Sequence, residues 1–158
     1  MRVVVKIGTS TATEQGRLSP PRLLEYAKVL AQLSSAGHEI AWVSSGAVAA
    51  GREALGIAPG ERHVAAKQML ASVGQPRLMA LYGELCGYYG QRVAQVLLTR
   101  WDLERRRSYL NARRTFEELF SHRVLPVVNE NDTVATEEIR VGDNDQLSAL
   151  VANLIDAR

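Results

Sequence analysis

Cysteine, lysine and long apolar runs are scarce in this chain of 158 residues. The single cysteine, Cys86, cannot form an intramolecular disulfide, and its apolar surroundings in the sequence predict a buried thiol in a reducing compartment. No stretch is long and apolar enough to cross a bilayer, and the apolar run after Met1 is too short for a signal peptide. We therefore expect no membrane partner and a cytoplasmic location.

Charge is also nearly balanced, because 19 basic and 17 acidic residues leave a formal net charge of +2. Such a chain produces no strong field that would attract nucleic acid or an anionic membrane. The hydrophobic share of 46% is enough for a real core, and the length fits one domain. We therefore expect a globular protein of one domain without a nucleic-acid partner.

Apolar runs of strand length alternate along the chain with segments of helical periodicity. We expect strands at residues 3–5, 39–44, 92–98 and 124–128. We expect helices at 19–37, 46–56, 64–72, 76–89, 111–121 and 144–157, with a charged surface segment at 101–108 and a segment of β character at 133–141. This alternation predicts an α/β fold with a mainly parallel sheet that is covered on both faces.

The first candidate site follows the first expected strand, where Lys6 leads into Gly8, Thr9 and Ser10. Glycine allows the backbone to approach a ligand closely, and successive N–H groups in such a turn can bind an anion. Lys6 would supply a positive charge for a phosphate. The glycine spacing of a Walker A loop is absent, and an ordinary turn after a partly exposed lysine is an equally good interpretation.

The second candidate site lies where residues 39–44 run into a helix through Ser44, Ser45 and Gly46. Either serine would serve as a helix N-cap, which would be a purely structural role. The same geometry directs free N–H groups toward any anion in front of the helix. Small residues at 46–51 would permit either the approach of a ligand or close packing of the helix, so both interpretations stay open.

The third candidate site is a cluster of acidic and amide side chains in residues 129–132 and 142–146. It follows a buried strand, and ligands bind at the carboxyl ends of strands in α/β sheets. Asp132 and Asp145 could hold an ammonium group or magnesium, and Asn144 can donate to a carboxylate while it accepts from an amine. A single aspartate at such a position usually caps a helix or forms a turn, but a whole cluster favours a ligand site.

Together these segments resemble the glutamate 5-kinases of the amino acid kinase family. The matching segments occur in the family's order and include V-V-K-I-G-T-S, V-S-S-G-A-V-A-A-G-R, P-V-V-N-E-N-D-T-V-A-T and V-G-D-N-D-Q-L-S-A-L. The resemblance implies a three-layer αβα sandwich. It also implies transfer of the γ-phosphoryl group of ATP to the side-chain carboxylate of L-glutamate, which gives γ-glutamyl phosphate in the first step toward proline.

The resemblance also implies roles for individual residues. The catalytic residues would be Lys6 and Asp145; the glutamate-binding residues would be Ser45, Asp132 and Asn144; the residues next to ATP would be Lys6, Gly8, Thr9, Ser10 and Gly46. ATP is expected to bind with Mg²⁺, and no residue is assigned as a metal ligand. A carboxylate is already ionised at neutral pH, so catalysis would consist of charge neutralisation and alignment without a general base.

The resemblance covers only the N-terminal part of the family's kinase domain. We therefore expect residues 1–158 to form the glutamate-binding side of a sandwich that is incomplete at its C-terminus. The nucleotide-binding C-terminal part and an RNA-modification-type domain would be absent, and turnover by this chain alone would be weak or absent. The alternatives are a truncated non-catalytic module that binds glutamate or proline, and a related kinase for another acid. Proline as a feedback inhibitor and a homo-oligomer are further implications of the resemblance.

Overall fold

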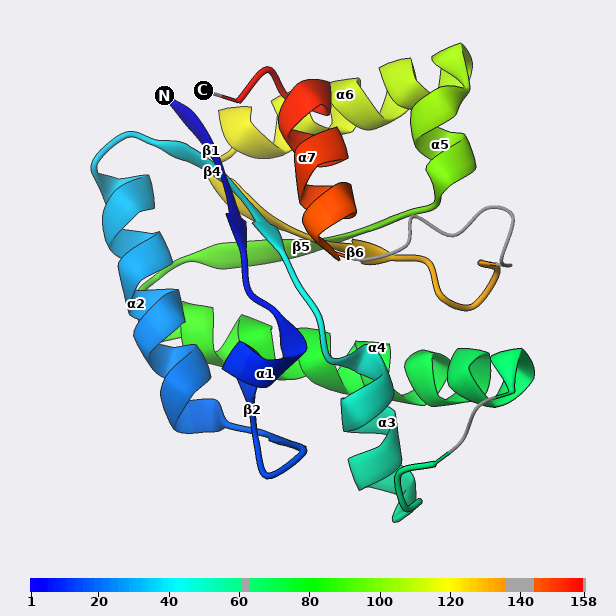
Figure 1. Ribbon diagram of the computed structural model, residues 1–158. Helices are drawn as coiled ribbons and strands as arrows, with labels where there is room; N and C mark the ends of the chain where they lie inside the picture. Colours follow the sequence, from blue (N-terminus) through cyan, green and yellow to red (C-terminus); the bar gives the residue numbers. More distant parts are fainter. Residues whose placement is uncertain (61–62, 136–143, 158) are drawn as a thin grey trace.

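The chain is described by a computed structural model that covers residues 1–60, 63–135 and 144–157 (Figure 1). Within these residues a four-stranded sheet has the order β1-β4-β6-β5. The strands are β1 (Arg2–Lys6), β4 (Glu39–Val43), β5 (Arg92–Leu98) and β6 (Val124–Glu130). Each neighbouring pair is parallel. The carboxyl ends of all four strands therefore meet at one edge of the sheet.

Helices cover both faces of this sheet, as the alternating pattern predicted (Figure 1). One face carries α2 (Pro20–Ser35), α3 (Ala47–Leu55) and α4 (Val64–Gly87). The other face carries α5 (Arg100–Glu104), α6 (Arg106–Ser121) and α7 (Asn144–Leu154). The expected α/β fold with three layers is thus confirmed for the described residues.

Strand β4 shows how the sequence builds two separate cores. Successive side chains of a strand point to opposite faces, so Ile40 and Trp42 enter the core beneath α2 and α4, whereas Ala41 and Val43 enter the core beneath α6 and α7. All four residues are buried. A strand that is apolar at every position is typical of a parallel sheet with both faces covered.

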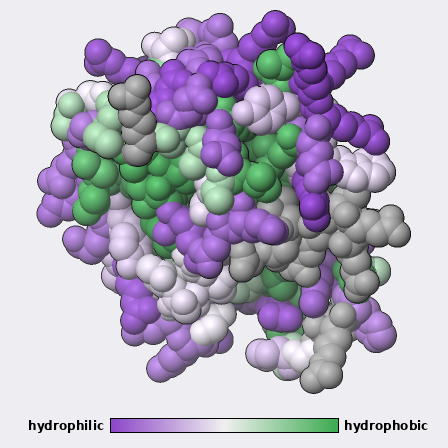
Figure 2. Space-filling model, turned by 45° about the horizontal axis from the view of Figure 1, so that its top comes forward, coloured by the Kyte–Doolittle hydropathy of each residue, from purple (hydrophilic) through white to green (hydrophobic). Residues whose placement is uncertain are grey.

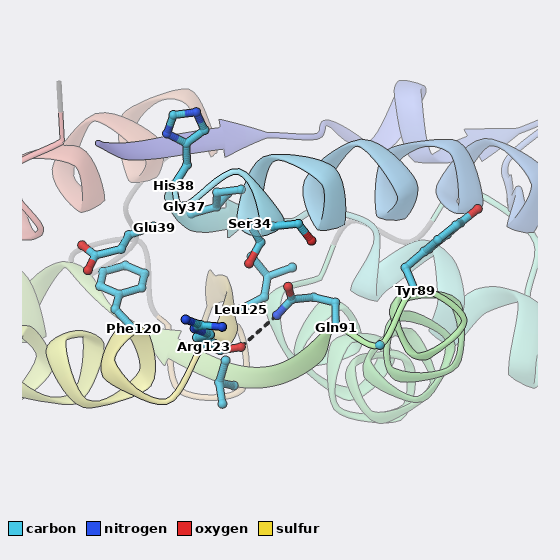
Figure 3. A pocket seen from close by; sticks show the side chains of 13 residues that line it. Ser34, Gly37, His38, Glu39, Tyr89, Gln91, Phe120, Arg123 and Leu125 are labelled. Carbon is cyan, nitrogen blue, oxygen red and sulfur yellow. Dashed lines mark hydrogen bonds between the residues drawn. The ribbon is translucent and has the colours of Figure 1, made fainter.

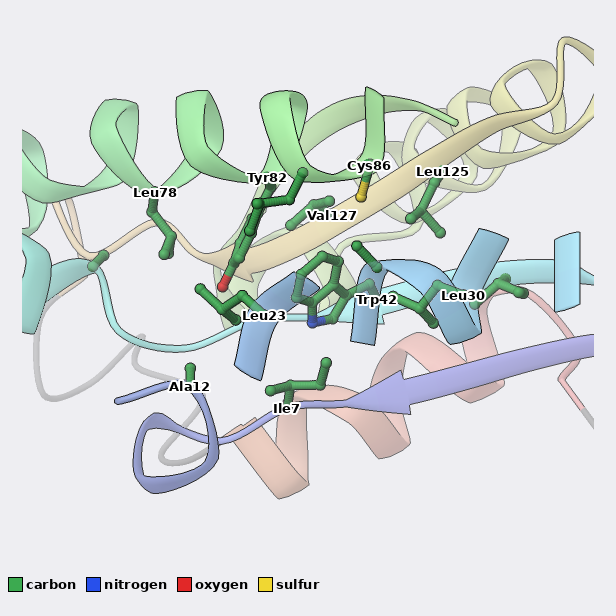
Figure 4. Close-up of a cluster of buried hydrophobic side chains, with 14 of the residues drawn as sticks. Ile7, Ala12, Leu23, Leu30, Trp42, Leu78, Tyr82, Cys86, Leu125 and Val127 are labelled. Atoms are coloured by element: carbon green, nitrogen blue, oxygen red, sulfur yellow. The ribbon is translucent and has the colours of Figure 1, made fainter. Parts of the chain in front are cut away.

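The larger core surrounds Trp42 (Figure 4). The rings of Trp42 and Tyr82 lie 4.1 Å apart between centroids and are tilted by 42°. Cys86 is fully buried one helical turn beyond Tyr82, and burial raises the pKa of its thiol to about 11. The predicted buried thiol is confirmed.

Helix α4 differs from the prediction because it is continuous from Val64 to Gly87, although two helices were expected at 64–72 and 76–89. Pro76 lies inside it. Proline removes one helical hydrogen bond and commonly ends or kinks a helix. Here the helix continues because Leu70, Leu78 and Tyr82, on both sides of the proline, are fully buried in the structure.

Three further local predictions were incomplete or wrong. Residues 101–108 are mostly exposed, as expected of a charged surface segment, but all except Arg105 belong to helices, and a capping box of Thr99 and Asp102 starts α5. Helix α6 begins at Arg106, five residues before the expected start. A short helix α1 (Thr9–Ala12) and the antiparallel pair β2 (Thr13–Glu14) and β3 (Arg17–Leu18) were not predicted.

Most of the segment expected to have β character, residues 133–141, lies outside the described residues, as do Gly142 and Asp143. Among the helices that the structure describes, none is long and apolar enough to span a membrane. The face drawn in Figure 2 is mostly hydrophilic, with hydrophobic atoms between the hydrophilic regions. The edge strand β1 is only partly buried.

Candidate functional site

A cavity of about 340 Å³ lies at the carboxyl edge of the sheet. Its walls come from α1, from the β4–α3 turn with the start of α3, from the end of β6, and from the start of α7. Of the predicted site residues, it brings together Thr9, Ser45, Gly46, Asp132 and Asn144. These residues belong to three sequence segments that only the parallel sheet places side by side. We call this space the carboxyl-edge cavity.

One wall of the carboxyl-edge cavity is the N-terminus of α3. Gly46 is the N-cap and has a φ of +108°, a left-handed conformation that side chains disfavour. Ala47, Val48 and Ala49 follow it in the first turn and line the cavity. First-turn N–H groups lack acceptors within their helix, and the helix dipole adds partial positive charge. This wall therefore suits an anionic group.

The two serines before Gly46 do not cap α3, so the capping interpretation was wrong. Ser44 is buried, and its Oγ lies 2.8 Å from the hydroxyl of Tyr82. Asn144 Nδ2 donates to the carbonyl oxygen of Ser44 at 2.8 Å and also to Ser45 Oγ. These bonds connect the start of α7 to the β4–α3 turn, 99 residues earlier in the sequence.

Lys6 and Asp145 do not line the carboxyl-edge cavity, but they form an ion pair beside it. Lys6 Nζ lies 2.7 Å from Asp145 Oδ1, and Asp145 is adjacent in sequence to Asn144. The Asp145 side chain is 74% exposed. Exposed pairs contribute only about 0.2–1 kcal/mol. An incoming phosphate could therefore replace Asp145 as the partner of Lys6.

The remaining two predicted residues belong to the start of α1. Gly8 is the N-cap of this short helix and has extended backbone with a φ of −75°, so the expected glycine turn leads directly into α1. It lies close to Lys6, since a Cβ added at Gly8 would be 3.6 Å from Lys6 Nζ. Ser10 is exposed in α1 and is not among the residues that line the carboxyl-edge cavity.

Hydrogen bonds between amide side chains hold the end of β6 in place. Gln75 Nε2 donates to Gln95 Oε1 at 3.0 Å, and Asn129 Nδ2 donates to Gln75 Oε1 at 2.9 Å. Asn129 Oδ1 in turn accepts from the backbone N–H of Glu130. Asn129 and Glu130 also line the carboxyl-edge cavity. This chain of bonds fixes the strand end that carries the acidic residues.

Arg52 lines the same cavity and was missed by the sequence analysis. It lies on α3, four residues after Val48 and three after Ala49, and such spacings share one helix face. This spacing could have identified Arg52 once the start of α3 was recognised as a candidate site.

A second cavity, of about 430 Å³, lies at the opposite edge of the sheet, where the strands begin (Figure 3). Gln91 donates there to the carbonyl oxygen of Arg123 at 3.1 Å. No predicted site residue lines it. Because ligands of parallel sheets bind at the carboxyl ends of the strands, we assign the candidate site to the carboxyl-edge cavity.

Comparison with known proteins agrees with the architecture. The sequence model of the amino acid kinase family matches residues 1–158. This chain belongs to the amino acid kinase family. The family resemblance that the motifs predicted is thereby confirmed.

Individual members of the amino acid kinase family are also similar to this chain. It is 58% identical to the glutamate 5-kinase of Deinococcus radiodurans over 99% of this chain and 44% of the relative. It is 57% identical to the glutamate 5-kinase of Herpetosiphon aurantiacus and 51% identical to that of Escherichia coli O1:K1. These alignments cover 100% and 98% of this chain but 43% and 42% of the relatives. The chain therefore spans less than half the length of these relatives.

Proposed function

We propose that this chain forms the glutamate-binding side of a kinase that transfers the γ-phosphoryl group of ATP to the side-chain carboxylate of L-glutamate. The product is γ-glutamyl phosphate, the first intermediate toward proline. The observation that carries the proposal is the carboxyl-edge cavity, in which Ser45, Asp132 and Asn144 meet the N-terminus of α3, with Lys6 beside them.

The chemistry of the lining residues matches the groups of glutamate. The ammonium group requires an anionic partner, and Asp132 lines the cavity. The carboxylates require donors, which the first-turn N–H groups of α3 supply, while Asn144 holds Ser45 and the β4–α3 turn in place beside them. A carboxylate is a nucleophile without loss of a proton, so the site needs no general base.

Lys6 supports the placement of ATP on the side of Asn144. A lysine at the end of a strand offers a point charge to the transferred phosphate. Magnesium commonly binds through one or two carboxylates together with substrate phosphates, and the exposed carboxylate of Asp145 fits that role. In the described part of the chain no three His, Cys, Asp or Glu side chains form a metal site on their own. Bound Mg²⁺ would neutralise phosphate charge while Lys6 and Asp145 align the transferred group.

Binding is tested by calorimetry of the 158-residue chain with L-glutamate. We expect Asn144→Ala to weaken binding about tenfold or more, since it removes the hydrogen bonds that hold Ser44 and Ser45 at the site. Lys28→Ala changes an exposed lysine on α2 and serves as the matched control, with unchanged affinity. Equal affinity of Asn144→Ala and the unmodified chain would contradict the placement of glutamate in the carboxyl-edge cavity.

Transfer is tested with the protein as its gene encodes it, by trapping γ-glutamyl phosphate with hydroxylamine. Lys6→Ala is expected to lower kcat by about 100-fold or more, because it removes a cation from the transferred phosphate, whereas Lys28→Ala retains activity. Glutamate binding without any hydroxamate would support a non-catalytic binding module instead. Proline inhibition and homo-oligomer formation stay predictions.

A further inference from the structure

Arg52 occupies the junction of two cavities. It lines the carboxyl-edge cavity and also an adjoining cavity of about 460 Å³, and the two share Thr9, Ala49 and Arg52. Ser45, Asp132 and Asn144 line only the first of them. Arg52 therefore marks the end of the carboxyl-edge cavity that adjoins the second cavity, whereas Asn144 marks the side next to Lys6.

The buried Nε of Arg52 is an unsatisfied donor, because it has no hydrogen-bond partner among the described residues. A buried donor without an acceptor is costly, and more so when the group is charged. The planar fork of arginine fits a carboxylate with two parallel hydrogen bonds. An anionic ligand would satisfy this donor.

The other charged residues among the described ones that line the carboxyl-edge cavity are Glu130 and Asp132, and each already takes part in an interaction within the protein. Among the described residues one arginine and two carboxylates line the space, and a zwitterion with two carboxylates and one ammonium group complements them. If Arg52 only balanced these two acids, its removal would weaken every ligand of the cavity equally. If it contacts the ligand, its removal would matter only for ligands that carry the group it contacts.

We propose that Arg52 binds the α-carboxylate of L-glutamate, the one that does not react, and thereby orients the substrate and makes the site specific for amino acids with a free α-carboxylate. This inference rests on the proposed function. The reacting γ-carboxylate has to face Lys6, where the phosphoryl group arrives. The α-carboxylate then extends toward the far end of the cavity, which Arg52 lines.

The test compares L-glutamate with its α-amide, L-isoglutamine, and its γ-amide, L-glutamine, by calorimetry on the 158-residue chain. We expect the unmodified chain to bind glutamate roughly 10- to 100-fold more tightly than isoglutamine, as expected for a hydrogen bond between charged groups. Arg52→Gln should bind glutamate and isoglutamine with the same weak affinity. Arg52→Lys should retain part of the preference because it keeps the charge without the fork.

Arg17→Gln is the matched control, because Arg17 lines the adjoining cavity and not the carboxyl-edge cavity. It should retain the full preference for glutamate over isoglutamine. Circular dichroism of each variant establishes that it is folded before affinities are compared. Since the readout is a ratio of two affinities in one protein, a modest loss of stability does not imitate the expected result.

Two results would overturn the proposal while the proposed function stands. Arg52→Gln could keep the preference for glutamate over isoglutamine, or it could lose the preference over glutamine instead, which would place the γ-carboxylate at Arg52. Failure of the unmodified chain to bind glutamate at all would refute the proposed function itself, together with this inference.

Discussion

Replacement of Gly74 by alanine tests whether helix packing fixes the anion-binding wall of the site. Helix α4 crosses α3 at two glycines without space for a side chain. A Cβ at Gly74 would lie 1.8 Å from the carbonyl oxygen of Ala47 and 2.5 Å from the backbone nitrogen of Gly51. Both atoms belong to backbone, so neither can rotate away. The helices would have to separate by about 1 Å or more to restore van der Waals contact.

The change in the free energy of unfolding follows from two opposing effects. Alanine is about 1 kcal/mol better than glycine inside a helix. Overpacking of a tight contact costs about 1–3 kcal/mol or more, and the upper end applies here because backbone opposes the new methyl group. We therefore expect Gly74→Ala to lower the free energy of unfolding by about 2 kcal/mol, which corresponds to a Tm about 4–8 °C lower for a chain of this length.

Gly83→Ala is the matched control on the same helix. A Cβ there would meet Val93 Cγ2 at 3.9 Å, an ordinary contact. No steric clash opposes the higher helix propensity of alanine over glycine at this position. The variant should therefore be more stable than the unmodified chain by about 0.5–1 kcal/mol.

Thermal and urea unfolding followed by circular dichroism measures both variants, and calorimetry with L-glutamate measures the site. Ala47 opens α3 and lines the carboxyl-edge cavity, so Gly74→Ala should also weaken glutamate binding, whereas Gly83→Ala should not. Equal stability and equal affinity for the two variants would refute the close glycine packing and its link to the site.

Three other predictions concern buried and paired groups. Tyr82→Phe should lower the free energy of unfolding by about 1–2 kcal/mol, because it leaves the buried hydroxyl of Ser44 without its partner; urea unfolding at pH 7 measures this, and an unchanged midpoint would exclude the bond. Burial raises the pKa of the Cys86 thiol to about 11, so about 0.1% of it is thiolate at pH 8. Because the thiol is also buried, it should react with a thiol reagent only as fast as the chain unfolds. Rapid reaction of the folded chain would show that reagent can enter this core. Hydrogen bonds from Arg2 lower the pKa of Glu117, so the pair stabilises the fold above the unfolded pKa and this contribution is lost as pH falls through the lower folded value. Urea unfolding should therefore show that the free energy of unfolding falls less between pH 6 and pH 3 for Glu117→Gln than for the unmodified chain. The difference should be less than about 1 kcal/mol because the pair is partly exposed. The same fall in both proteins would contradict the pairing.

The strands and most helices could be predicted because their signals are local. A run of apolar residues before Gly46 and small residues after it define the end of β4 and the start of α3 without any knowledge of the rest of the chain. Pro76 misled the prediction for the opposite reason. A proline is a strong local signal for a break, but burial of the residues on both sides of it, which no local pattern reveals, keeps α4 continuous.

The candidate site could be predicted only as a set of segments. Ser45 and Asn144 were both expected to bind ligand, but their hydrogen bond joins residues 99 positions apart. A local sequence pattern does not show that two residues so far apart in the chain are in contact. Arg52 was missed because an arginine on a helix reads as an ordinary surface residue. Only the cavity and the unpartnered Nε distinguish it.

The two sides of the site differ in how firmly they are held, and this difference suits phosphoryl transfer. On one side, contact between the glycines of α3 and α4 leaves the first-turn N–H groups of α3 little freedom. Donors that are fixed before the reaction stabilise developing charge without reorganisation. On the other side, Lys6 is held by an exposed carboxylate, Asp145, whose contribution is small enough for a phosphate to replace. In the proposed function the acceptor would bind against this fixed wall, while Lys6 would exchange Asp145 for a phosphate of the arriving nucleotide.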